Sequence, residues 1–172
     1  MIDYHHDYYK GLSKIYFNKI LSKIIRLGNL NTEDGLILDF GCGYNYLKKR
    51  LNSKKVIGYD VIPEFSDVKN YKKLKPDIIV CNNILEHFTQ NEIIRKIREF
   101  KMMNKNCKFI TAIPTENWLS KLGMLITGIT HAHDDHKTKL KDINKILKEH
   151  CYFIKRKNVF TLCEVSLWKF KD

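Results

Sequence analysis

Long apolar runs, paired cysteines and prolines are what this sequence most clearly lacks. No apolar stretch approaches the ~20 residues that a membrane-spanning helix requires. The five cysteines are scattered along the chain, and none forms a C-x-x-C pair. An odd, scattered set favours reduced thiols over a disulfide framework or a cysteine-based zinc site. With three prolines and eight glycines, the chain also has no proline-rich or glycine-rich linker.

Length and composition predict one globular domain. The chain has 172 residues, of which 44% are hydrophobic and 12% aromatic, which is about one domain's worth of chain with a real core. Residues 1–9 show neither the basic stretch nor the apolar stretch of a secretion signal, so we expect a cytoplasmic location. We predict a single domain over residues 1–172, with a helical segment within residues 1–30 and an insertion over residues 114–137.

The net charge of +12 is the strongest compositional signal. Positive charge favours partners rich in phosphate, including nucleic acids. Of the 31 basic residues, however, only five are Arg, and Arg is the residue that forms bidentate contacts with phosphates and bases. The lysines are spread over the whole chain, which is typical of a general compositional bias. Nucleic-acid binding therefore stays open as an alternative.

Short apolar strands alternate with amphipathic helices along the chain. Apolar residues recur at helical spacing over residues 14–27, and Gly28 follows as a stop signal. Thr89 and Glu92 form the pattern of a capping box at the start of a second helix, and residues 138–150 form a third. Such alternation predicts a parallel sheet covered on both faces. The predicted strands are 36–40, 56–60, 77–82, 107–113, 152–160 and 162–170.

The last two predicted strands have no helix between them. Parallel neighbours need a crossover connection, so this pair must be antiparallel. The sequence therefore predicts a mostly parallel, mixed sheet with an antiparallel strand at its C-terminal end.

A glycine-rich turn follows the first predicted strand and carries the chemistry. Gly41 and Gly43 let the backbone approach a ligand closely, because neither has a Cβ atom. Asp39 would repel a pyrophosphate and favour a cationic ligand, and Tyr46 stands where a dinucleotide fingerprint requires its third glycine. Asp60 ends the next strand, where an acid can accept hydrogen bonds from ribose hydroxyls.

These motifs, together with the stretch Asp-Ile-Ile-Val-Cys-Asn-Asn-Ile-Leu-Glu-His over residues 77–87, resemble the class I S-adenosylmethionine-dependent methyltransferases. The small-molecule branch of that family often has Leu-Glu-His at this point, and the resemblance spans about residues 36–170. It implies an α/β fold of the Rossmann-like, doubly wound type. It also implies S-adenosylmethionine as the cofactor and methyl transfer to an acceptor, with a small molecule as the leading class.

The resemblance assigns cofactor roles to the matching positions. Asp39 would orient the methionine end of the cofactor, Asp60 would bind the ribose diol, and Asn82 would lie beside the methionine portion. Because Asp60 would serve a ligand, we expect its removal to weaken cofactor binding and to change the stability of the fold little. Val61 and Ile62 would enclose the adenine. The implied cofactor-binding set is Asp39, Phe40, Gly41, Cys42, Gly43, Asp60, Val61, Ile62, Asp67 and Asn82, with Asp67 meeting the adenine amino group.

The chain departs from the family pattern at two places. Asn45 replaces the third glycine of the turn, and Asn tolerates left-handed backbone better than other non-glycine residues. Only residues 61–76 separate the second predicted strand from the third, where the family normally fits a helix and a further strand. A crossover needs ~10–12 residues, so we expect a reduced region between the second and fourth strands of the family.

Histidines dominate the predicted acceptor side. His87 follows the third predicted strand and could act as a general base with a pKa near neutrality; the alternative is that Glu86 and His87 only cap the next helix. The segment 131–136 contains three histidines. It has three interpretations: it lines the pocket, it forms a solvated loop, or it binds a metal. We predict His87 and His133 as catalytic residues. We predict no metal, because nothing in the sequence fixes this segment on one helical face.

Two other segments have several interpretations. The apolar segment 118–130 is interpreted as a lid, as an interfacial membrane contact or as a packed insertion helix. Tyr4, Tyr8 and Tyr9 either cap the cofactor or belong to a loosely ordered terminus. For the whole chain, the alternatives to a small-molecule enzyme are an RNA or nucleic-acid-associated methyltransferase and a non-catalytic subunit with the same fold. The intact Asp39 and Asp60 argue against the last of these.

Overall fold

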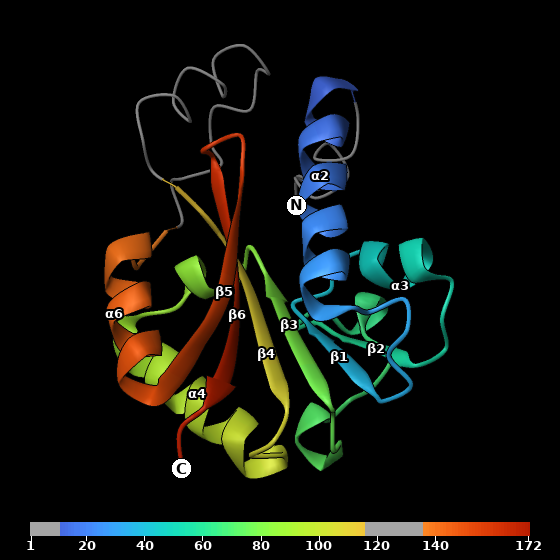
Figure 1. The fold of residues 1–172 in the computed structure, drawn as a ribbon. Helices are drawn as coiled ribbons and strands as arrows, with labels where there is room; N and C mark the ends of the chain where they lie inside the picture. Colours follow the sequence, from blue (N-terminus) through green and yellow to red (C-terminus); the bar gives the residue numbers. More distant parts are fainter. Residues whose placement is uncertain (1–10, 116–135) are drawn as a thin grey trace.

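One six-stranded sheet organises the molecule, as a computed structural model of residues 11–115 and 136–172 shows (Figure 1). Its strands are β1 (Ile37–Phe40), β2 (Val56–Tyr59), β3 (Ile78–Asn82), β4 (Lys108–Pro114), β5 (Cys151–Val159) and β6 (Cys163–Phe170). They lie in the order β2-β1-β3-β4-β6-β5. The first four are mutually parallel, whereas β6 is antiparallel to both of its neighbours. This confirms the predicted α/β fold class with its antiparallel strand.

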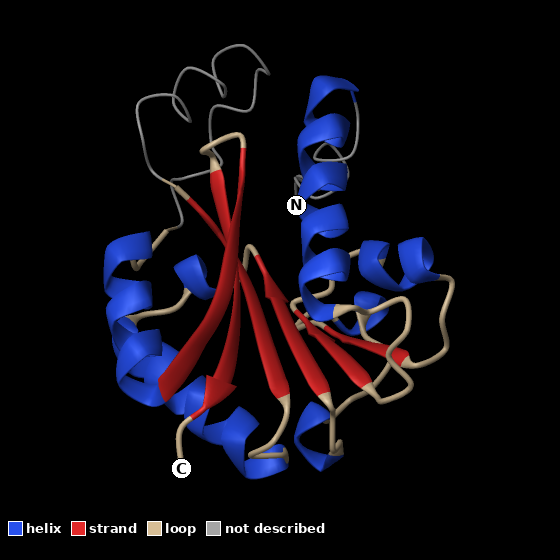
Figure 2. Ribbon diagram, viewed as in Figure 1, coloured by secondary structure: helices blue, strands red, loops and turns tan. Residues whose placement is uncertain are grey.

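Helices cover both faces of the sheet (Figure 2). The helices are α2 (Gly11–Gly28), α3 (Tyr46–Leu51), α4 (Gln90–Met103) and α6 (Leu140–His150). Alternation along each strand sends successive side chains to opposite faces. On β1, for example, Ile37 packs with the helices α2 and α3, while Leu38 packs with α4 and α6. The predicted capping box at Thr89 and Glu92 is present at the start of α4.

The connection between β2 and β3 is the reduced region that the sequence predicts. Residues 61–76 are all described, and they form two short 3-10 helices, η1 (Pro63–Phe65) and η2 (Tyr71–Lys73), and no strand. Strand β2 therefore lies at one edge of the sheet, and β5 lies at the other. The adenine side of the expected site is built by this short connection.

Several predictions fall outside the described residues. They concern Tyr4, Tyr8 and Tyr9, the apolar segment 118–130, and His131 and His133. Within the part of the chain that is described, no helix combines the length and apolar character needed to cross a bilayer.

Candidate cofactor and acceptor site

The carboxyl ends of the parallel strands bring the predicted motifs to one edge of the sheet. Strand β1 runs into the turn of Gly41 and Gly43, β2 runs into Asp60, and β3 ends at Asn82. In open α/β sheets, ligands bind outside this edge, where neighbouring connections diverge to opposite faces. The structure therefore places the main sequence motifs where such a fold binds its ligand.

The two glycines of the turn have different structural roles. Both have positive φ, +78° at Gly41 and +47° at Gly43. A Cβ atom on Gly41 would come within 2.7 Å of Cγ1 of Ile84, so close packing requires glycine there. A Cβ atom on Gly43 would meet nothing within 4 Å. Gly43 therefore borders open space, which is the space a ligand could use.

Asn45 adopts the left-handed conformation that its place in the motif requires, with φ 57° and ψ 39°. Its Nδ2 donates a hydrogen bond to the carbonyl oxygen of Phe65 at 2.7 Å. The sequence-based expectation that Asn replaces the third glycine is confirmed. The side chain also ties the turn to the reduced region, which a glycine could not do.

Asp60 supports the turn through two backbone hydrogen bonds. Its Oδ2 accepts from the N–H of Gly43 at 2.9 Å, and its Oδ1 accepts from the N–H of Ile62 at 3.0 Å. The expectation that Asp60 serves only a ligand is therefore wrong, since the carboxylate also holds the loop that shapes the site. Each carboxylate oxygen has a second lone pair, so both remain able to accept from a diol.

Asp39 is buried in β1, 4% exposed, at the centre of an acidic cluster. Burial is the main cause that raises its pKa to about 7, and the nearby carboxylates of Asp60 and Asp67 contribute to the same shift. A group whose charged form is disfavoured in this way gains most from a positively charged ligand. The electrostatics of this edge thus favour a cation over an anion.

Val61, Ile62 and Asp67, which the sequence predicts around the adenine, lie in the connection that follows β2. Val61 is 81% exposed, and Ile62 is half-buried. Oδ2 of Asp67 accepts hydrogen bonds from the N–H of Gly58 at 2.7 Å and from Nζ of Lys48 at 2.8 Å. Partial burial raises the pKa of Asp67, but these partners outweigh it and hold the pKa below its ordinary value.

Two of the predicted residues point their side chains away from the open edge. The Phe40 ring packs in the core, with its centroid 5.1 Å from the rings of Tyr71 and Phe100. The Cys42 thiol is buried and donates to the carbonyl oxygen of Phe65 at 3.4 Å. Their possible contribution to a ligand site is through the backbone.

Two adjacent asparagines end β3 with buried amide oxygens. Oδ1 of Asn82 and Oδ1 of Asn83 find no hydrogen-bond donor in the described part of the chain. Asn83 also adopts positive φ, 51°, and donates its N–H to the carbonyl oxygen of Ala112. Buried acceptors of this kind mark a place where a ligand or water supplies the donor.

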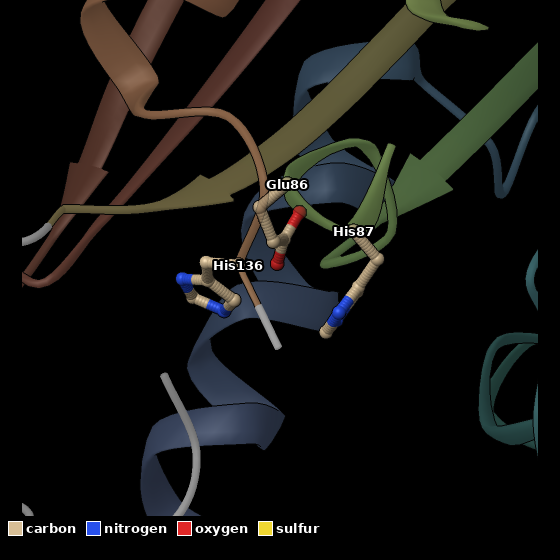
Figure 3. Close-up of side chains that lie close together, drawn as sticks. All are labelled: Glu86, His87 and His136. Carbon is tan, nitrogen blue, oxygen red and sulfur yellow. The ribbon is translucent and has the colours of Figure 1, made fainter. Parts of the chain in front are cut away.

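The acceptor side gathers Glu86, His87 and His136 (Figure 3). Glu86 and His87 lie in η3 (Leu85–His87), and the Glu86 carboxylate is buried. The rings of His87 and His136 lie edge to face, with centroids 5.3 Å apart. The sequence named His87 and the histidine segment separately, but only the fold brings His136 beside His87 and Glu86.

Backbone hydrogen bonds hold these two segments together. The N–H groups of Lys137 and Thr138 donate to the carbonyl oxygen of Glu86 at 2.8 and 3.2 Å. The Thr138 hydroxyl donates to the carbonyl oxygen of Phe88 at 2.6 Å. Residues far apart in the sequence thus share one fixed cluster next to the end of β3.

Comparison with solved structures shows the fold. A methyltransferase from Clostridium acetobutylicum is 14% identical, with a TM-score of 0.69, and the match covers 98% of each chain. Magnesium protoporphyrin IX methyltransferase from Synechocystis, solved with bound S-adenosylhomocysteine, is 16% identical, with a TM-score of 0.65, over 96% of this chain and 92% of that one. The N-methyltransferase NodS from Bradyrhizobium japonicum is 13% identical, with a TM-score of 0.66, over 92% of this chain and 98% of that one.

A sequence comparison shows the family. No curated protein sequence matches the chain significantly. The model of a family described as methyltransferase domain, in contrast, matches residues 12–164, which include every strand of the sheet except most of β6. The chain therefore belongs to the methyltransferase domain family, and it is an S-adenosylmethionine-dependent methyltransferase with the class I fold.

Proposed function

We propose that this enzyme methylates a small polar molecule, with the cofactor bound over the carboxyl ends of β1, β2 and β3. The observation that carries the proposal is the set of unfilled features at that edge. Gly43 borders open space, and among the described residues no donor reaches the buried Oδ1 of Asn82. The acidic cluster around Asp39 favours a cation. These features fit a ligand that has a sulfonium, an ammonium group and a ribose.

Each predicted cofactor residue has a role that its observed contacts allow. Asp39 would face the positive charge of the methionine end, and Asp60 would accept from the ribose diol while it holds Gly43 in place. Val61 and Ile62 would flank the adenine. Asp67 uses Oδ2 for Lys48 and Gly58, so Oδ1 is the atom we propose for the adenine amino group. Phe40, Gly41 and Cys42 would contribute backbone.

The bound cofactor supplies an electrophilic methyl group on a positively charged sulfur. The protein's part is to align the acceptor with that methyl group and to exclude water. On the acceptor side, His87 is placed to take up a proton where the acceptor atom must lose one. We also propose His133, which lies outside the described residues, as a second catalytic residue.

A small-molecule acceptor is supported by the relatives and by the composition of the edge. The similar structures include a magnesium protoporphyrin IX methyltransferase and a pyocyanin biosynthetic protein. The acceptor side of this chain offers imidazole, carboxylate and amide groups, which suit a polar molecule better than a phosphate backbone.

Calorimetry on the free enzyme tests the cofactor site. S-adenosylmethionine and S-adenosylhomocysteine should bind, and NADH should not. Replacing Asn82 with Ala should weaken binding of both adenosyl ligands by the value of one hydrogen bond, about 1 kcal/mol. The matched control is Asn106→Ala, at an exposed turn remote from this edge. Absence of binding by wild-type protein at millimolar concentration would refute the proposed function.

A further inference from the structure

We propose that Glu86, His87 and His136 form a binding site for a divalent transition-metal ion, with Zn²⁺ as the principal candidate. One ligand atom from each residue lies within 4.8 Å of the other two. Figure 3 shows the Glu86 carboxylate directed into the space between the two imidazole rings. Such a site differs from the sequence-based prediction, which considered only the segment 131–136 and expected no metal.

The donor set selects the class of ion. Two imidazole nitrogens and one carboxylate oxygen suit Zn²⁺ and other first-row transition ions, whereas Mg²⁺ and Ca²⁺ prefer oxygen ligands alone. Tetrahedral bonds of about 2.0–2.1 Å require ligand atoms about 3.3 Å apart. Closing the remaining distance requires the two half-buried imidazole rings to turn toward the buried carboxylate when the ion binds.

The backbone around the three residues is already organised for a shared ligand. Glu86 and His87 lie in η3. His136 immediately precedes Lys137 and Thr138, whose N–H groups donate to Glu86. The hydrogen bonds from Lys137 and Thr138 to the carbonyl of Glu86 fix the distance between the two segments. Little ordering of the backbone is therefore needed on binding, and preorganisation of this kind raises affinity.

Three protein ligands leave a coordination position open, as in catalytic rather than structural zinc sites. The cluster adjoins the end of β3 on the acceptor side and shares none of its three residues with the cofactor-binding set. An oxygen or nitrogen atom of the methyl acceptor could fill that position, a step that rests on the proposed function. Metal binding itself does not rest on it. A His87 nitrogen that holds the ion is no longer a free base, so His87 acts as a base only in metal-free enzyme.

Calorimetric titration of the chelator-treated full chain with ZnCl₂ tests the site. The wild type should bind one equivalent of Zn²⁺. His87→Ala and His136→Ala should each weaken binding at least tenfold, while the control His150→Ala, at the end of α6, should bind as the wild type does. Circular dichroism establishes that each variant is folded. Glu86→Gln, which keeps the shape of the buried side chain, should weaken binding as well.

Two outcomes would overturn the proposal. One is that folded wild-type protein takes up no stoichiometric Zn²⁺. The other is that both histidine variants retain wild-type affinity, which would assign the ion to other groups, such as the five free cysteines. S-adenosylhomocysteine binding, measured on the same chelated samples, should stay unchanged. Failure of the metal site is thereby distinguished from failure of the cofactor site.

Discussion

Asp39 shows how a single buried carboxylate can couple stability, pH and ligand charge. It lies inside the sheet next to two other acids, so its ionisation is opposed by burial and by repulsion. Its pKa is about 7 in the folded chain and 3.8 as an unperturbed side chain. The folded state therefore holds this proton more tightly than the unfolded state. The resulting stabilisation is complete below pH 3.8 and is lost as the pH rises through about 7.

Asp39→Asn should flatten that pH dependence. Between pH 4 and pH 7, the wild-type free energy of unfolding should fall more than that of the variant, because Asn has no proton to lose. The affinity for S-adenosylmethionine should rise with pH through about 7 in the wild type, since the ionised acid attracts the cation. In Asp39→Asn, the affinity should be lower and should not follow this titration. Urea denaturation measures the free energy of unfolding and calorimetry measures the affinity at each pH, with Asp142→Asn as the control. If the free energy of unfolding of Asp39→Asn and of the wild type changed with pH in parallel, the expectation would be contradicted.

Asp60 should matter for stability as well as for binding. Asp60→Ala removes the acceptor for the N–H groups of Gly43 and Ile62, and a hydrogen bond to a charged group contributes roughly 1.5–3 kcal/mol. Asp60→Asn keeps one acceptor oxygen and should lose less. Thermal denaturation of the ligand-free protein gives the stability, and calorimetry gives the cofactor affinity. An Asp60→Ala protein with wild-type stability would show that these two backbone contacts contribute little.

At the scale of elements, the sequence predicts what local pattern controls. Apolar runs locate the four parallel strands, and the Thr89–Glu92 capping box begins α4 as expected. The final hairpin turn has positive φ at Phe160 and Thr161, a conformation that such residues rarely adopt and that no turn residue in the sequence announces.

The residues of the candidate site also differ in whether local sequence pattern can predict them. Asp39, Gly41 and Asp60 can be found from sequence because they stand directly beside strand ends, whose common edge follows from the topology. The contact of His136 with His87 cannot, because residues 88–135 separate the two and only tertiary packing brings them together. The hydrogen bond from the N–H of Gly43 to Asp60 cannot be found from sequence for the same reason.

Substitutions of Asn45 test how the glycine-rich turn between β1 and α3 is stabilised. Asn45→Ala loses the hydrogen bond to Phe65 and places an alanine in left-handed backbone, which costs about 1–2 kcal/mol by itself. Asn45→Gly loses the bond but adopts the conformation freely. Asn52, left-handed at the end of α3, is the matched control, because it shares the conformation and lies away from Phe65. In urea denaturation, the Ala variant should be less stable than the Gly variant at both positions. The Gly variant should be less stable than the wild type only at Asn45. Equal stability of Asn45→Ala and Asn45→Gly would contradict this expectation.

At the scale of the whole molecule, one group of basic side chains lies apart from the proposed cofactor site. Strand β5 carries the exposed residues Lys155, Arg156 and Lys157, and it forms the sheet edge opposite β2. Strands β4 and β6 lie between it and β3, where the proposed cofactor site ends. Arg156 is also paired with Glu164 at 3.0 Å, which offsets part of the charge. This group of basic side chains therefore lies three strands away from β3, beside which the proposed acceptor site is located.

Reversing charge on this strand should separate the two classes of acceptor. Lys155→Glu combined with Lys157→Glu should leave cofactor affinity within twofold of wild type, because strands β4 and β6 separate both side chains from β3. Reversal at Lys72, Lys73 and Lys75 should do likewise, apart from a small loss of stability where Lys72 gives up its ion pair with Glu99.

Binding of a labelled single-stranded RNA to the wild type should be weak and non-specific, of micromolar or lower affinity, since it would rest on scattered lysines. Fluorescence anisotropy between about 50 and 200 mM salt measures it, because each phosphate contact steepens the dependence of affinity on salt. Tight RNA binding with a steep salt slope that the Lys155 and Lys157 reversals abolish would contradict the expectation. The acceptor would then reach the methyl group from the β5 side, and a nucleic acid would replace the small molecule as the substrate class.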